Sequence, residues 1–250
     1  MTRAVLALVG LLLFAATARA EPDAACQVPE GLVQADFPMP RVAEAIAAKT
    51  LEIAVIGSAS SALAGPGGAG KAYPGRLEAE LGAELPGVTV RVSTFAKPRQ
   101  SAAEMQAVIP EILATKKPAL VVWQSGTADA IRGVDPEDFR FALEEGVEAL
   151  HKGGADVVLM NMQFSPRTES MIALNAYADA MRFVALQQSV NLFDRFSVMK
   201  HWNEAGVFDL TVATKKMDMA ERVHACFAKL LARLIVDSVA LTRQEQKAND

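Results

Sequence analysis

Runs of buried-type residues alternate along this chain with stretches whose apolar positions recur at helical spacing. The runs are nearly continuous in valine, isoleucine and leucine, which is typical of strands covered on both faces of a parallel sheet. The last run is shorter and gives the weakest signal. The pattern therefore predicts five strands, at Leu51–Gly57, Val88–Phe95, Ala119–Gln124, Asp156–Phe164 and Val190–Asp194.

Helix-start signals lie between these runs. Ser101 and Glu104 have the spacing of a capping box, S-x-x-E, which predicts a helix that Pro110 kinks or breaks. Asp135 precedes Pro136 as a helix cap precedes a proline in the first helical position. Two further long helices are expected over residues 165–188 and 219–241.

Strand–helix alternation of this kind predicts a doubly wound α/β fold with three layers. We expect a single domain over residues 21–240, followed by a polar tail at 241–250 that frays. Sites in such folds lie at the carboxyl ends of the strands. The residues that follow Gly57, Phe95, Gln124 and Phe164 are therefore the place to look for chemistry.

The first twenty residues have the pattern of a signal peptide. Arg3 precedes an apolar run, Ala4–Ala16, and Ala18-Arg19-Ala20 has the small-x-small form of a cleavage site. The apolar run is short for a membrane span, although an uncleaved anchor is the alternative. We expect residues 1–20 to be removed and the mature chain to be exported without an integral membrane segment.

The mature chain is acidic. Loss of Arg3 and Arg19 from 25 basic residues leaves 23 against 29 acidic ones, a net charge of about −6. This balance argues against a nucleic-acid or anionic-membrane partner. The two cysteines, Cys26 and Cys226, are either a disulfide or two free buried thiols, and an oxidising compartment favours the disulfide.

No metal or other cofactor is expected. His151, His201 and His224 are scattered and form no ligand cluster with the two cysteines. The stretch Gly65–Ala72, GPGGAGKA, nearly matches a phosphate-binding loop, but Ala72 lacks the hydroxyl that would bind magnesium. Seven residues also separate this loop from the preceding strand, so we interpret it as a surface loop.

The stretch IAVIGSASSALAG, residues 53–65, places serines directly after the first strand. A nucleophilic serine occupies such a turn in many hydrolases, and an adjacent base must activate its hydroxyl. Ser58, Ser60 and Ser61 are the candidates.

Several short motifs, in order, carry a resemblance to a known family. They are IGS after the first strand, YPGRLEAEL (73–81), VVWQSGTADA (121–130), GGADVVLMNMQFSP (153–166), MKHW (199–202) and DMAERVHACFAKLL (218–231). From about Leu51 to Leu234 the chain resembles the SGNH hydrolase superfamily, or GDSL esterases, and in particular its exported bacterial branch. The resemblance implies a flavodoxin-like α/β/α sandwich, a periplasmic location and ester hydrolysis by a serine with oxyanion donors and an Asp-x-x-His pair.

The residues at the family's catalytic positions differ from the expected ones. The nucleophile position is Ala59, the asparagine position is Ala128, and the second block offers Pro98 or Arg99 where a glycine is expected. Near the carboxyl end, one register places Asp218 on the base and Lys215 on the acid, and the other places Lys216 and Ala213 there. Removing members of such a triad costs several powers of ten in rate, so we predict that the ordinary family chemistry is absent.

Three hypotheses follow. The first is a non-catalytic protein that binds a carbohydrate, a cell-wall fragment or a partner protein in a cleft containing Ser58, Gly126 and Asp129. Basic residues would either form the rim of this cleft or be ordinary solvated side chains, namely Lys97, Arg99, Lys215 and Lys216. Trp123 and Gln124 are interpreted as strand-end packing.

The second hypothesis is a divergent esterase. Ser60 or Ser61 would be the nucleophile, and the base would be Lys215, Lys216 or His224. A lysine base needs burial to lower its pKa, and His224 is interpreted as a packing residue on a helix. The third hypothesis is a purely structural protein without a ligand.

Overall fold

Five parallel strands form the centre of the computed structural model, which describes residues 24–63, 65–211 and 218–249. The strand order is β2-β1-β3-β4-β5. The five predicted strands and the α/β class are confirmed, although the strand predicted over Asp156–Phe164 ends at Met160. Their bounds are β1 (Thr50–Gly57), β2 (Thr89–Ala96), β3 (Leu120–Gln124), β4 (Asp156–Met160) and β5 (Asn191–Phe193).

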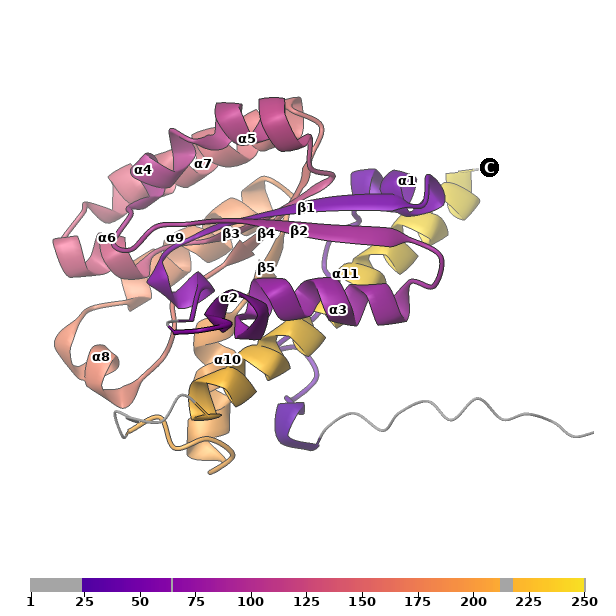
Figure 1. Cartoon of the computed structure of the whole chain (residues 1–250). Helices are drawn as coiled ribbons and strands as arrows, with labels where there is room; N and C mark the ends of the chain where they lie inside the picture. Colours follow the sequence, from indigo (N-terminus) through magenta and orange to yellow (C-terminus); the bar gives the residue numbers. More distant parts are fainter. Residues whose placement is uncertain (1–23, 64, 212–217, 250) are drawn as a thin grey trace, which may run out of the picture.

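Helices cover both faces of the sheet and complete three layers (Figure 1). On one face α11 packs against α3 and α1, and on the other α7 packs against α4, α5 and α9. The first group is α1 (Pro40–Ala47), α3 (Tyr73–Glu84) and α11 (Asp218–Asn249); the second is α4 (Ala102–Gln106), α5 (Ile109–Lys116), α7 (Pro136–Lys152) and α9 (Asn175–Gln187). Shorter elements are η1 (Ala24–Cys26), η2 (Ala59–Ser61), α2 (Gly68–Lys71), α6 (Thr127–Arg132), α8 (Pro166–Met171) and α10 (Arg195–Glu204).

The order of the strands reverses between β1 and β3. From β1 the chain crosses to β2 on one side, and β3, β4 and β5 then extend the sheet on the other side. The register pairs Ile56 with Trp123, so Gly57 and Gln124 end the two strands side by side. Because two crossovers leave in opposite directions here, a crevice at the carboxyl ends is expected at this point.

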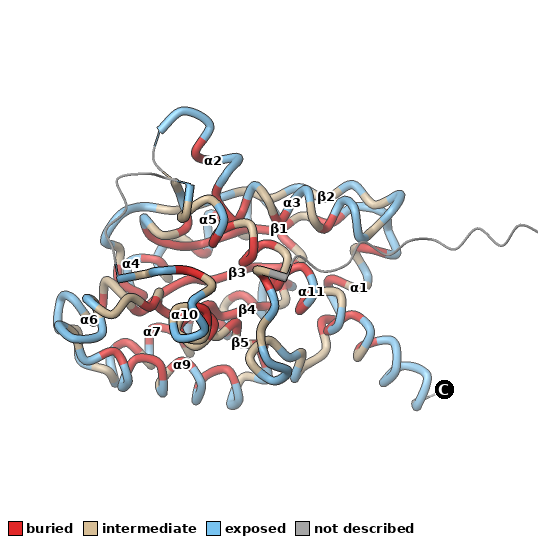
Figure 2. Tube along the Cα trace, turned by 90° about the horizontal axis from the view of Figure 1, so that it is seen from below, coloured by how far each residue is buried: buried red, intermediate tan, exposed pale blue. Residues whose placement is uncertain are grey.

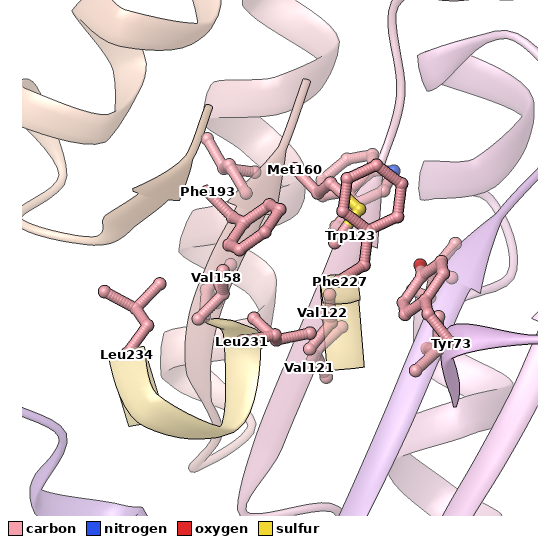
Figure 3. Close-up of a cluster of buried hydrophobic side chains, with 14 of the residues drawn as sticks. Tyr73, Val121, Val122, Trp123, Val158, Met160, Phe193, Phe227, Leu231 and Leu234 are labelled. Atoms are coloured by element: carbon pink, nitrogen blue, oxygen red, sulfur yellow. The ribbon is translucent and has the colours of Figure 1, made fainter. Parts of the chain in front are cut away.

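The core fills the space between the sheet and the long helix α11. Figure 3 shows Phe227, Leu231 and Leu234 of α11 lying over side chains of β3, β4 and β5. These three positions recur at the spacing of one helix face, and all are buried. Figure 2 shows the burial of the described residues, with largely buried central strands and helices that expose their outer faces. The edge strand β2 has no buried residue.

The predicted helix-start signals are confirmed. The Ser101 side chain accepts the Glu104 N–H while the Glu104 carboxylate accepts the Ser101 N–H, which is the capping box. The helix breaks before Pro110, which lies in the first turn of α5. The Asp135 side chain accepts the Glu137 N–H at the start of α7.

Two expected elements differ from the structure. The helix expected over residues 165–188 is divided into α8 and α9, because Ile172 is extended. The break separates a short helix with no buried residue from one with a continuous buried face. The tail at 241–250 was expected to fray, but α11 continues to Asn249. Thr242 is buried there, and its Oγ1 accepts the Met39 N–H at 2.8 Å.

Side chains of β4 and β5 form hydrogen bonds with the segment before β1. The Asn191 carboxamide accepts the N–H groups of Asp36 and Phe37 and donates to the Phe37 carbonyl. The Asp156 carboxylate accepts the Val42 N–H at 2.9 Å, at the start of α1. Burial raises the pKa of Asp156 to about 6. This segment is therefore part of the fold.

A disulfide joins Cys26 in η1 to Cys226 in α11, as predicted. It links positions 200 residues apart, and both cysteines are buried. Within residues 24–63, 65–211 and 218–249, no helix has the length and apolar character needed to cross a membrane.

Replacing both cysteines by serine is expected to lower the free energy of unfolding by about 2–5 kcal/mol, because the cross-link restricts a long loop of the unfolded chain. Thermal and urea unfolding of the variant measure the loss. Non-reducing mass spectrometry of the parent protein should give a mass two daltons below that of the dithiol. An unchanged midpoint after reduction would contradict this role.

Candidate functional site

The serine turn follows directly from β1 and lies at the reversal of strand order. Ser58 is the residue before η2, and Ser58 and Ser61 are buried while Ala59 is exposed. Gly57 allows this close packing, because a Cβ at this position would lie 2.2 Å from the Ser61 Oγ. The tip of the turn is thus an alanine methyl group, and the hydroxyls point elsewhere.

One amide oxygen accepts hydrogen bonds from several polar groups of this turn. The Gln124 Oε1 accepts the Ser58 N–H at 3.2 Å and the Oγ hydroxyls of Ser60 and Ser61, each at 2.9 Å. The Ser58 hydroxyl lies 3.4 Å from the same oxygen. Gln124 is almost fully buried, and its Nε2 has no hydrogen-bond partner among the described residues. Gln124 is therefore the acceptor that holds the turn in place, which the packing interpretation did not anticipate.

Tyr73 and His224 extend this network into α3 and α11. The Tyr73 hydroxyl lies 3.0 Å from the Ser61 Oγ, and the Tyr73 N–H donates to the His224 Nδ1 at 3.0 Å. Burial raises the pKa of Tyr73 to about 12. Burial, assisted by the nearby Arg195, lowers the pKa of His224 to about 4. A neutral imidazole that accepts at Nδ1 carries its proton on Nε2, so His224 is a donor toward any further group.

Arg195 is a buried cation at the first position of α10. Its side chain is only 1% exposed, and its Nη1 donates to the Ser60 Oγ at 3.3 Å. Its Nε and Nη2 are buried and have no hydrogen-bond partner among the described residues. Burial lowers the pKa of Arg195 to about 10, so the guanidinium remains charged at neutral pH. Sequence reasoning did not single it out.

Ser60, Arg195 and His224 line one pocket of about 210 Å³. Gln163 and Ser165, from the segment after β4, are its other polar residues. The rest of the wall is apolar and comes from Phe164, Met199, Leu210, Met219, Ala220, Val223 and Phe227. The structure thus brings together a serine, an unpaired cation and a neutral histidine around an apolar cavity.

The positions that the sequence resemblance aligns with catalytic residues lie in three different segments. Ala59 is exposed at the tip of the turn, Ala128 lies in α6, and Asp218 is the exposed first residue of α11. Ala213, Lys215 and Lys216 lie outside the described residues. Among the described residues, none of the hydroxyls of Ser58, Ser60 and Ser61 is hydrogen-bonded to an imidazole, a carboxylate or an amine.

Gly126 and Asp129, the other residues expected in the cleft, contribute to the turn that follows β3. Gly126 has a φ of +100°, and a Cβ there would lie 2.5 Å from the Met162 sulfur. Asp129 is buried, and its carboxylate accepts the Ala102 N–H at 2.9 Å. Burial raises the pKa of Asp129. Ser58, Gly126 and Asp129 are not among the residues lining the 210 Å³ pocket.

The remaining polar candidates make surface contacts. Lys97 and Arg99 are exposed after β2. Lys71, in the glycine-rich stretch, forms an ion pair with Glu221 at 2.8 Å. In the part of the chain that the structure describes, no group of three histidine, cysteine or carboxylate side chains is arranged to hold a metal ion.

Residues 25–241 match the model of the non-GDSL lipase-like family. No curated protein matches the chain significantly. Among solved structures, the chain is similar to TesA, with 26% identity, a TM-score of 0.53 and coverage of 74% of this chain and 94% of that one.

Two further solved structures show the same fold at lower identity. A catalytic mutant of the acetylxylan esterase Axe2 from Geobacillus stearothermophilus is 16% identical, with a TM-score of 0.60 over 74% of this chain and 94% of that one. The SGNH-hydrolase family esterase AlinE4 is 20% identical, with a TM-score of 0.52 over 74% and 96%. The chain therefore has the α/β/α fold of SGNH hydrolases, as the sequence resemblance implied.

Gly57→Ala is expected to destabilise the protein by about 1–3 kcal/mol, because the added methyl group collides with Ser61 in a fully packed turn. Gly82→Ala is the matched control. It lies in α3 with open space around its Cβ position, and there the helix propensity of alanine should stabilise by up to about 1 kcal/mol. Urea unfolding of both variants measures the difference. Equal effects would contradict the packing argument.

Because of His224, the free energy of unfolding is expected to fall as the pH is lowered from 6.5 to 4. Its pKa is about 4 in the folded protein and about 6.5 unfolded, so the unfolded state binds more protons in this window. His224→Asn supplies a side-chain oxygen near the Nδ1 position but does not titrate. The parent should lose about 1–3 kcal/mol more than this variant between pH 7 and 4.5. Asp156 titrates in both proteins and cancels in the comparison. Parallel pH dependences would contradict a buried neutral His224.

Proposed function

We propose that this chain, which belongs to the non-GDSL lipase-like family, is a non-catalytic binding protein with the SGNH hydrolase fold. The observation that carries the proposal is the shared acceptor of the serine turn. The Gln124 Oε1 holds the hydroxyls of Ser60 and Ser61, and that of Ser58 more loosely.

A serine becomes a nucleophile only when a neighbouring base takes its proton. An amide oxygen is not basic enough at neutral pH to do so, and it holds the hydroxyl hydrogen in place. Ala59 and Ala128 supply neither a hydroxyl nor a side-chain donor where SGNH hydrolases have a serine and an asparagine. The turn therefore has the backbone of a nucleophile turn without the arrangement of groups that acyl transfer needs.

The pocket beside the turn is the binding site in this proposal. It combines apolar walls with a few polar groups, which is typical of small-molecule sites. A carbohydrate, a cell-wall fragment or a segment of a partner protein is the proposed ligand. The name of the structural relative Axe2, an acetylxylan esterase, favours a carbohydrate-derived molecule.

We place the protein outside the cytosol, in the periplasm. The support is the disulfide between Cys26 and Cys226, since disulfides persist in oxidising compartments. The signal peptide expected at residues 1–20 lies outside the described residues and gives a second, sequence-based reason.

The alternative is a divergent esterase that uses Ser60. It is favoured by one observation, namely that Ser60 and His224 line the same pocket. Against it, the His224 Nδ1 already accepts the Tyr73 N–H, which leaves the proton on Nε2, and burial lowers the pKa of His224 to about 4. Such an imidazole is poorly suited to accept a proton from a hydroxyl.

Purified mature protein should give no labelling with a fluorophosphonate serine probe and no hydrolysis of acetyl esters above the rate of the Ser60→Ala/Ser61→Ala variant. A thermal-shift screen of cell-wall sugars run in parallel should identify a stabilising ligand. Labelling at Ser60 or Ser61 that alanine abolishes would establish the esterase instead. A blank screen without labelling would favour a protein with no ligand.

A further inference from the structure

We propose that the carboxyl half of β2 binds an extended, acidic segment of a partner protein, which adds to the sheet as a further strand. This inference goes beyond the proposed function, because it concerns a surface that shares no lining residue with the 210 Å³ pocket.

β2 is an edge strand whose backbone groups alternate between β1 and the outside. The N–H groups of Thr89 and Lys97 both donate across the ladder to carbonyls on the β1 side, at 2.9 and 3.2 Å. In a parallel pair, the N–H and C=O of one residue point to the same side and those of the next residue to the opposite side. The residues that direct both groups away from β1 are therefore Val90, Val92, Thr94 and Ala96.

A side chain covers one position of this edge. The Glu78 carboxylate, from α3, accepts the outward Val92 N–H at 2.7 Å. Among the residues that the structure describes, the outward N–H groups of Thr94 and Ala96 have no hydrogen-bond partner. Unpaired backbone groups on an edge are a template for another strand. Beyond Val92 the edge therefore has the donors and acceptors that an extended backbone matches.

A pocket of about 330 Å³ lies beside this open part of the edge. Thr94, Phe95 and Ala96 line it from β2, and Val108 and Ile112 line it from the α4–α5 side. Figure 1 shows β2 with α3 below it and α4 and α5 above it. Side chains of a strand alternate between two faces. Every second side chain of an added strand would thus lie on the side of the pocket, whose apolar wall favours valine or isoleucine.

Basic residues at the end of the edge favour an acidic segment. Lys97 lines the same pocket, and Arg99 follows it; both are exposed, and neither forms an ion pair with a described residue. Glu111 is the one carboxylate in the pocket lining, so the cations are in excess here. Charges farther apart than about 8 Å are largely screened at physiological salt. The two local cations therefore matter more to a docked segment than the acidic balance of the whole chain.

A second copy of this chain fits the edge less well. Two β2 strands related by a two-fold axis pair antiparallel, and a pairing centred on Thr94 needs the Val92 N–H that Glu78 already occupies. It also places Arg91 of one copy, which pairs with Glu52, opposite Lys97 of the other. Like charges directly opposite destabilise strand pairing. A short acidic segment that pairs only beyond Val92 avoids both obstacles.

Fluorescence anisotropy with two labelled peptide amides tests the proposal on the mature protein. One has the sequence Thr-Val-Thr-Val-Asp-Asp and the other its reverse, so the aspartates can reach Lys97 in either strand direction. One of the two should bind, and its counterpart with lysine in place of aspartate should bind at least tenfold more weakly. Methylation of alternate backbone nitrogens of that peptide should abolish binding in only one of the two phases, because only every second N–H faces β2.

Thr94→Pro removes an outward N–H but keeps the ladder with β1, since proline is tolerated where an edge N–H faces solvent. This variant should lose at least tenfold in peptide affinity. Val90→Pro makes the same change on the other side of Val92, and as the matched control it should bind like the parent. Urea unfolding of both variants checks that the fold is kept.

A charge reversal tests the same surface without changing the backbone. Lys97→Glu should lose at least tenfold in affinity for the aspartate peptide. Arg243→Glu, at an exposed position near the end of α11, changes the net charge equally and should bind like the parent. This pair of variants decides the proposal if a proline variant does not fold.

Several results would overturn the proposal. They are failure of both aspartate peptides to bind at millimolar concentration, equal binding of the aspartate and lysine peptides, and unchanged affinity of a folded Thr94→Pro variant. A concentration-dependent dimer in analytical ultracentrifugation that Thr94→Pro abolishes would assign the edge to a second copy instead. Each of these results leaves the non-catalytic proposal intact, because that proposal depends on serine labelling and on ligands of the other pocket.

Discussion

The pairing of β1 with β3 is the constraint on which the candidate site depends. Because the sheet extends in opposite directions from these two strands, a crevice is expected above their carboxyl ends. The register places Gly57 and Gln124 next to each other there. A glycine without a side chain and a glutamine that accepts several hydrogen bonds then fix the serine turn against the sheet. Because Ser60 of this turn lines the adjacent pocket, the position of the turn helps to determine the shape of the pocket.

The polar groups around the turn divide into two sets with different physical roles. Gln124, Ser61, Tyr73 and His224 are buried and joined by hydrogen bonds, so they rigidify the junction of β1 with α3 and α11, although the Gln124 Nε2 has no partner among the described residues. Arg195 is buried to a similar extent but is satisfied at only one nitrogen. The first set accounts for the defined conformation of the turn. The second is the feature that a purely structural account leaves unexplained.

Much of the fold could be predicted from the sequence, because its signals are local. Runs rich in valine, isoleucine and leucine identified all five strands, the last one only weakly, and the capping box at Ser101 and the break at Pro110 depend only on neighbouring residues. The division of residues 165–188 into two helices was missed, because helical spacing on either side of Ile172 gives no sign of a change in direction. The burial of Thr242 was missed because its partner, Met39, is 203 residues away.

The site was less predictable, because its contacts join residues that are far apart in the sequence. The alanines at positions 59 and 128 could be identified by alignment to motifs along the chain. The role of Gln124 depends on three serines from a different strand end, and the isolation of Arg195 depends on which residues surround it in space. An arginine that follows an aspartate at the start of a helix is usually a surface residue. Only the packing of α10 against α11 and the serine turn turns it inward.

The disulfide between Cys26 and Cys226 also has a consequence for the timing of maturation. The chain has only two cysteines, so each has a single possible partner within the molecule and no incorrect intramolecular pairing can form. The second cysteine follows all five strands in the sequence. A chain that crosses a membrane from its amino end would therefore expose every strand before the bond could close. The bond would then close only after all five strands had emerged.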